Sequence, residues 1–178
     1  MGLMNNDLSE FDALSVDETA ESDQNLPRTL VTFRLGPQVF AVDVGWVREV
    51  VDICETAPLP GAPHGVIGMI DLREETISIM DLASRLGIRS AEGKDTRIIV
   101  FTFGDDESAV SLGVIADQVL RVCEIDAHAL EPMPDTKTGW RSADIEGLVR
   151  TEDGNAMVLE IEKILCAGAD QPGEFDFG

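Results

Sequence analysis

The sequence predicts a mostly β protein built as small barrels or as a sandwich. Short runs in which apolar and polar residues alternate recur at close intervals, whereas helical periodicity is confined to short stretches. Turns rich in glycine, proline and acidic residues separate these runs. With 178 residues, 44% of them hydrophobic, the chain is long enough to bury a real core.

Both ends of the chain have the composition of solvated tails. Residues 1–26 hold seven acidic and no basic residues and show no sustained periodicity, so we expect folding to begin near Pro27. Residues 167–178 hold three acidic and no basic residues. Their last five residues, EFDFG, are either a short linear docking peptide or an unselected end. Deleting residues 167–178 is expected to leave the fold intact.

The first predicted elements are a hairpin and a helical turn. Apolar residues alternate over 31–35, stop at Gly36-Pro37 and alternate again over 40–44, which predicts a β-hairpin. The apolar residues between Trp46 and Val51 then fall at helical spacing in a short, β-branched stretch, which predicts a single helical turn.

The proline-rich segment 57–63 predicts a rigid, exposed loop, because proline fixes φ and lacks an N–H group. Strands are predicted over 66–72 and 76–80, with a turn at Glu74-Glu75. Asp81 is expected to cap a short helix that Gly87 ends in a left-handed conformation.

The second half is also rich in predicted strands, and a polar stretch over 89–94 separates it from the first. The predicted strands are 97–103, 109–115, 119–125, 145–150 and 157–161. A rigid loop is predicted over 130–134, residues 136–142 are too polar to be core, and a last short helix is predicted over 160–166.

Composition excludes several classes of function. The net charge of −21 argues against nucleic acid and anionic membranes, whose phosphates require clustered Lys and Arg. Without an 18-residue apolar run or a signal peptide, the chain is expected to be cytoplasmic, with no direct membrane insertion. The three cysteines are far apart and the two histidines, His64 and His128, have no ligand spacing, so we predict no disulfide, no metal and no cofactor.

Residues 66–82, VIGMIDLREETISIMDL, resemble the signature of the CheW family of bacterial chemotaxis coupling proteins: a strand, an Asn-Leu-Arg-Gly turn, a second strand and an Asp-Leu helix start. Other segments agree with the family in order and spacing. They are 33–35, 40–42, 47–50, 59–63, 113–119 and 161–165. No single segment is specific, but their joint order would rarely arise by chance, and the resemblance covers roughly 29–165.

The resemblance implies a fold and two partners. The fold is two small five-stranded SH3-like barrels packed together, with strand exchange between the halves and an approximate division near 88–96 of a domain spanning 27–166. The partners are the cytoplasmic tip of a methyl-accepting chemoreceptor and the regulatory domain of the histidine kinase CheA. The protein would then lie near receptor arrays at the membrane.

Two departures surround the key arginine of the signature, Arg73. Asp71 and Glu74 replace the family's Asn and Gly, which adds negative charge on both sides of Arg73. Glu74 also carries a Cβ where glycine could take a positive φ, which leaves the shape of the turn open. We hypothesise that these acids select a partner with a basic surface.

Arg73 follows an apolar strand and precedes a turn, so its guanidinium is expected to be exposed and to offer a planar fork of donors to a partner. The alternative is a solvated arginine neutralised by neighbouring acids. Together with this arginine, the residues expected to face the receptor are Val44, Val47, Glu49, Val50 and Asp71. For the valines, burial in a barrel is the competing interpretation.

The proline loop is the candidate kinase-binding segment, because a rigid apolar loop loses little conformational entropy on docking. Its candidate contacts are Thr56, Leu59, Pro60 and Pro63. A plain crossover between strands is the equally weighted alternative.

A small acidic hydrolase is the main alternative from another class of function. The acidic clusters at 74–75 and 105–107 fall on predicted turns, where such groups are usually solvated surface. The sequence contains no GxSxG, Walker A or GxGxxG motif, so we expect no enzyme. An adaptor of another pathway, such as pilus motility or gene regulation, stays open.

Overall fold

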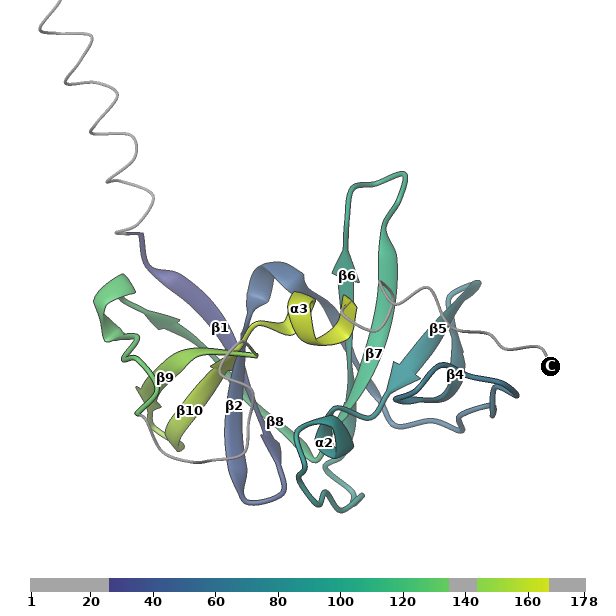
Figure 1. Cartoon of the computed structure of the whole chain (residues 1–178), viewed down its shortest axis with the longest axis horizontal. Coiled ribbons are helices and arrows are strands. Elements are labelled where there is room, and N and C mark those ends of the chain that lie inside the picture. The colour runs from purple at the N-terminus through teal and green to yellow at the C-terminus, as the bar shows by residue number, and fades with distance from the viewer. Residues whose placement is uncertain (1–25, 135–143, 167–178) are drawn as a thin grey trace, which may run out of the picture.

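Ten strands and four short helical segments form the described part of the chain, residues 26–134 and 144–166 of this computed structural model (Figure 1). The strands are β1 (Arg28–Leu35), β2 (Gln38–Asp43), β3 (Val47–Asp52), β4 (Val66–Leu72), β5 (Glu75–Met80), β6 (Arg97–Phe103), β7 (Val110–Ala116), β8 (Gln118–Ile125), β9 (Ile145–Thr151) and β10 (Gly154–Leu159). The helical segments are the 3-10 turns η1 (Val44–Trp46) and η2 (Ala127–Ala129) and the α-helices α2 (Leu82–Arg85) and α3 (Ile161–Cys166).

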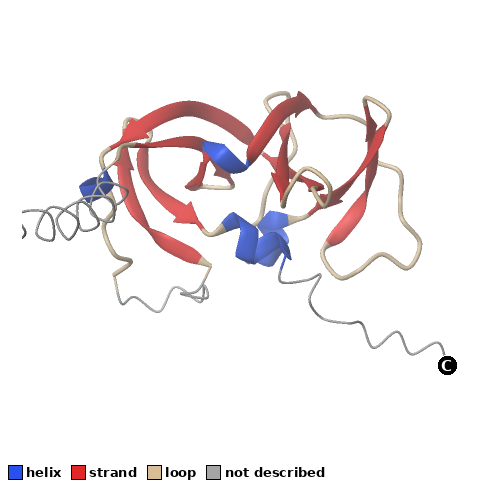
Figure 2. Cartoon of the chain, turned by 90° about the horizontal axis from the view of Figure 1, so that it is seen from above, coloured by secondary structure: helices blue, strands red, loops and turns tan. Residues whose placement is uncertain are grey.

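The strands form two five-stranded sheets that exchange segments between the two halves of the chain. Sheet A has the order β8-β1-β2-β10-β9, and sheet B has the order β3-β6-β7-β5-β4. Each half therefore gives a hairpin to one sheet and the next three strands to the other. In Figure 1 the two sheets lie side by side with α3 between them, and Figure 2 shows the helices gathered mainly in the middle.

The sheets share one large apolar core, and each has a smaller one of its own. Phe33 and Phe40 of sheet A belong to the same buried cluster as Phe101 of sheet B, to which α3 adds Ile161 and Ile164. A second cluster lies within sheet A and a third within sheet B, on the faces turned away from the shared core. Because strands alternate their side chains, the central strands contribute to two cores at once.

The predicted fold class is confirmed as mostly β, with two five-stranded sheets and short helices. The closure of each sheet into an SH3-like barrel stays a prediction. The opening hairpin is confirmed as β1 and β2, and Asp81 caps α2 by accepting a hydrogen bond from the Ser84 amide at 3.0 Å. Gly87 follows α2 with a φ of 69°, as predicted.

The helical turn predicted from Trp46 to Val51 is wrong over most of its length. Only Val44–Trp46 is helical, as η1, and β3 begins at Val47. A bulge explains the misleading spacing, since Val47 pairs with Phe101 and Glu49 with the preceding Val100, leaving Arg48 as an extra residue. The bulge interrupts the alternation of apolar residues that would have indicated a strand.

The division near 88–96 separates two sequence halves but not two sheets. Strands β6 and β7, which follow it, complete the sheet that contains β3, β4 and β5. The alternation of apolar residues along a strand indicates where the strand lies, but not which half of the chain supplies the neighbouring strand. The exchange therefore changes which strands form each sheet and does not change where the strands begin and end.

Some predictions lie outside the described residues. These are the tails over 1–25 and 167–178 and the polar region 136–142. Within the described residues, no helix is long and apolar enough to cross a membrane.

Candidate partner-binding site

The turn between β4 and β5 presents Arg73 to solvent. The register pairs Leu72 with Glu75, so the turn consists of Arg73 and Glu74 and lies one residue earlier than predicted. Both residues have positive φ, 50° and 70°, as a type I′ hairpin turn requires. The side chain of Arg73 is 75% exposed, which confirms the predicted exposure of this arginine.

Arg73 forms an ion pair with Glu49 that links the two edge strands of sheet B. The Arg73 Nη2 and Glu49 Oε2 atoms are 3.1 Å apart, and the Glu49 side chain is only 16% exposed. Strand β3, which carries Glu49, lies at one end of the sheet order, and β4, which leads into the turn, lies at the other. Two of the predicted receptor-facing residues therefore lie together in space.

A second arginine completes this charge cluster. Arg48, the bulge residue of β3, donates a hydrogen bond from Nη1 to Glu75 Oε2 at 2.5 Å and contacts Ser111 Oγ at 3.2 Å. Its Nε lies 3.5 Å from Glu49 Oε1. The hydrogen bond with Arg48 holds the pKa of the Glu75 carboxyl below its ordinary value and raises the pKa of the guanidinium.

The remaining predicted receptor-facing residues divide between surface and core. Val44 and Val50 are 37% and 41% exposed, whereas Val47 is half-buried and packs against the shared core. Val50 pairs with Ile99 and Glu49 with Val100, so the two side chains lie on opposite faces of edge strand β3. The Asp71 carboxylate accepts a hydrogen bond from Thr76 Oγ1 at 3.0 Å.

The loop before β4 carries the four predicted kinase-binding residues. It is tied to β4 by a pair of 2.8 Å backbone hydrogen bonds between Ala57 and Met69, which bring the Thr56 methyl group over Gly68. Pro60 and Pro63 are exposed, whereas Thr56 and Leu59 are half-buried. The loop thus offers two exposed prolines on an anchored backbone.

Leu59 and Pro63 also border a mainly apolar groove of about 550 Å³. Its other walls come from strands of sheet B, including Met80 and Phe103, and from α3 through Leu165. An apolar groove beside a rigid loop is suited to binding a protein segment rather than a charged small molecule.

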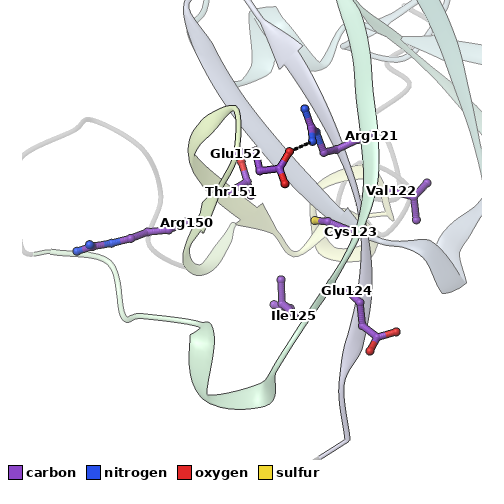
Figure 3. A pocket seen from close by; sticks show the side chains of 8 residues that line it. All are labelled: Arg121, Val122, Cys123, Glu124, Ile125, Arg150, Thr151 and Glu152. Carbon is purple, nitrogen blue, oxygen red and sulfur yellow. Dashed lines mark hydrogen bonds and ion pairs between the residues drawn. The ribbon is translucent and has the colours of Figure 1, made fainter.

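A second pocket, of about 510 Å³, lies at the end of sheet A, between β8 and the β9–β10 hairpin (Figure 3). The side chain of Arg121 points toward Glu152 there and forms an ion pair with it. Asp153 binds the same guanidinium, with its Oδ2 atom 2.6 Å from Arg121 Nε. Two carboxylates therefore already hold the Arg121 guanidinium in this pocket.

The ion pairs of the two sheets occupy equivalent positions with reversed charge. Arg48 has no pairing partner in the register of β3 with β6, and Leu120 has none in the register of β8 with β1. Glu49 directly follows Arg48, and Arg121 directly follows Leu120. Each of the two forms an ion pair with a hairpin turn at the opposite edge of its sheet: Glu49 with Arg73, and Arg121 with Asp153. Sequence reasoning missed Arg121, and it missed Arg48 although Arg48 stands next to Glu49.

The residues around Arg73 combine exposed charge with exposed apolar area. Among the described residues, no group of three or more His, Cys, Asp and Glu side chains is arranged to hold a metal ion. Cys54 is exposed, and Cys123 is half-buried with its pKa raised by that burial. The arrangement offers an exposed guanidinium, flanking acids and exposed valines.

Comparisons with known proteins agree with this description. Residues 29–168 match the family model of the CheW-like domain. The chemotaxis protein CheW of Treponema pallidum is 34% identical over 140 residues, covering 78% of this chain and 82% of the relative. The chemotaxis protein CheW of Thermotoga maritima is 33% identical over 137 residues, covering 76% and 86%.

A solved structure also matches. The scaffolding protein TtCheW from Thermoanaerobacter tengcongensis superposes with a TM-score of 0.68 at 30% identity, covering 78% of this chain and 88% of that one. With the family match spanning most of the chain, and relatives and a solved structure of the same family at 30% identity or more, the chain belongs to the CheW family.

Proposed function

We propose that this protein is a chemotaxis adaptor that couples the cytoplasmic tip of a methyl-accepting chemoreceptor to the regulatory domain of the histidine kinase CheA. It acts by binding, without catalysis, in the cytoplasm beside receptor arrays. The relatives are named chemotaxis proteins and the similar structure a scaffolding protein, which favours chemotaxis over another pathway. Linked weak contacts gain affinity from effective concentration, so neither interface needs to be strong alone.

The observation that carries the receptor face is the exposed Arg73 beside the mostly buried Glu49. Arg73 holds its guanidinium at the surface on a two-residue turn, where it can meet a partner's carboxylate or carbonyl groups. Val44 and Val50 supply exposed apolar area, and Val47 supports them from the core. Asp71, held by Thr76, adds a negative charge at the rim.

The kinase face is the anchored proline loop. Pro60 and Pro63 are exposed and their φ angles are fixed, so docking orders little additional chain. Leu59 lies between this loop and the groove and supplies an apolar contact, and the half-buried Thr56 holds the loop against Gly68.

The experiment compares two single variants against two purified partners, a receptor-tip hairpin and the CheA regulatory domain from the same organism. By titration calorimetry, Arg73→Glu is expected to weaken receptor binding by more than about tenfold and to leave kinase binding unchanged. Pro60→Glu is expected to do the reverse. Arg150→Glu, on sheet A, is the matched control. Equal receptor binding by Arg73→Glu and the unaltered protein would show that the receptor face is wrongly assigned.

A further inference from the structure

The proposed receptor face contains a second cation, Arg48, beside Arg73. Arg48 lies on the same charge cluster as Arg73 but is only one-third exposed, against 75% for Arg73. Its Nη1 atom lies 2.5 Å from Glu75 Oε2 and 3.2 Å from Ser111 Oγ. Arg48 is therefore held by a second carboxylate and a hydroxyl group, and Arg73 is the more exposed of the two arginines.

Glu49 is the group that both arginines share. Its two oxygens face different cations: Oε2 lies 3.1 Å from Arg73 Nη2, and Oε1 lies 3.5 Å from Arg48 Nε. Oε1 is fully buried and accepts no hydrogen bond from any described residue. A carboxylate in this position depends on nearby cations, because an unpaired buried charge is strongly unfavourable.

This sharing determines what happens when Arg73 turns toward a partner. If Arg73 were the sole counter-ion, leaving Glu49 would strand a mostly buried carboxylate, and that penalty would be subtracted from the binding energy. With Arg48 already beside Oε1, Glu49 keeps a cation after Arg73 has left. Sharing also weakens the resting pair, since the two guanidinium groups repel each other across one carboxylate.

We propose that Arg48 is a positioning residue that releases Arg73 from Glu49 and so makes it available to the receptor tip. Arg48 itself does not contact the partner. This inference rests on the proposed receptor face, and it assigns to that face a regulatory ion pair. The partner supplies the carboxylate that replaces Glu49 as the counter-ion of Arg73.

The binding test is a double-mutant cycle with the purified receptor-tip hairpin as the probe. Arg48→Gln is expected to weaken binding by about tenfold, a loss of roughly 1.4 kcal/mol. In the Glu49→Gln background, where no buried charge needs a counter-ion, the same change is expected to alter affinity less than about twofold. Arg48→Lys is expected to restore most of the affinity, and Arg150→Gln to change nothing. An equal loss in both backgrounds would overturn the proposal.

A second readout does not need the partner. Proton exchange at the Arg73 guanidinium, followed by NMR, is expected to slow in Arg48→Gln because Glu49 then holds Arg73 alone, and to return to its original rate in Arg48→Gln/Glu49→Gln. Unchanged exchange in Arg48→Gln overturns the role of Arg48. If the unaltered protein binds no receptor tip, the proposed function fails, and slowed exchange still supports the release of Arg73 by Arg48.

Discussion

At the scale of single residues, the receptor-facing turn carries backbone strain. Arg73 and Glu74 both adopt positive φ, and each carries a Cβ that crowds the backbone in this region. Among the described residues, these two are the non-glycine positions with positive φ. Strain at a proposed binding site is consistent with a turn whose shape is fixed for recognition.

The first prediction concerns Glu74. Replacing it by glycine removes the Cβ at a φ of 70°, so Glu74→Gly is expected to raise the free energy of unfolding by about 1 kcal/mol. The matched control is Glu107→Gly, in an exposed turn without positive φ, which is expected to lower it by about 0.5–1 kcal/mol. Urea denaturation measures both values. Destabilisation by Glu74→Gly would mean that the Glu74 side chain makes a stabilising contact.

The second prediction concerns pH. Arg48 lowers the pKa of Glu75 in the folded protein, so the unfolded state binds this proton more readily. The stabilisation of the folded protein by the ionised Glu75 is therefore fully present above the ordinary pKa of 4.5. It is lost as the pH falls through the lower pKa that Glu75 has in the folded protein. The stability difference between the unaltered protein and Glu75→Gln should be constant near pH 7 and shrink toward pH 3. Chemical denaturation across this range measures it, and a difference independent of pH would exclude the linkage.

At the scale of elements, each half anchors its crossover loop in the same way. The loop before β4 bonds to β4 through Ala57 and Met69, and the loop before β9 bonds to β9 through Glu131 and Leu148. In both strands a glycine lies beside the loop backbone. A Cβ on Gly68 would lie 2.6 Å from the Ala57 carbonyl oxygen, and one on Gly147 would lie 2.6 Å from that of Glu131.

Gly147→Ala is therefore expected to displace the second crossover loop. The added methyl group would also meet Leu130 at 3.0 Å, so the loop backbone must shift and its hydrogen bonds with Leu148 weaken. We expect a loss of about 1–3 kcal/mol in the free energy of unfolding. Gly93→Ala, where a Cβ meets nothing within 4 Å, is the control and should change it by less than about 1 kcal/mol. Equal thermal stability of the two variants would contradict this anchoring.

Sequence periodicity predicted the limits of most strands because one face of each is buried. It failed at β3, where the bulge at Arg48 breaks the alternation, and Glu49 turns a charged side chain inward to meet Arg73. The pairing of Arg48 with Glu75 was equally hidden, because it depends on two strands that are distant in sequence. At the candidate site, the prediction identified the exposed Arg73 but not the cluster around it.

At the scale of the whole molecule, the exchange of strands makes each sheet dependent on both halves. Two pairings join the halves within each sheet: β1–β8 and β2–β10 in sheet A, and β3–β6 and β5–β7 in sheet B. The pairings β2–β10 and β5–β7 are parallel, and parallel neighbours require a long connection. Strand patterns alone could not identify these partners, since every hairpin is also compatible with a sheet made within its own half.

The exchange predicts that neither half of the chain folds alone. A cut between Ser90 and Ala91, in an exposed connection, leaves the first half with two isolated hairpins, β1–β2 and β4–β5, and an unpaired β3. The second half would keep the hairpins β6–β7 and β9–β10 and an unpaired β8. Two-stranded hairpins are at best marginally stable in water, so each fragment should lack cooperative thermal unfolding.

Mixed in equal amounts, the two fragments should regain cooperative unfolding and restore the near-ultraviolet dichroism of the intact protein. The reason is that the core around Phe33 and Phe101 forms only when both fragments are present. Cooperative unfolding of either fragment by itself would mean that its strands can pair within their own half, and that the exchange is one of two accessible arrangements.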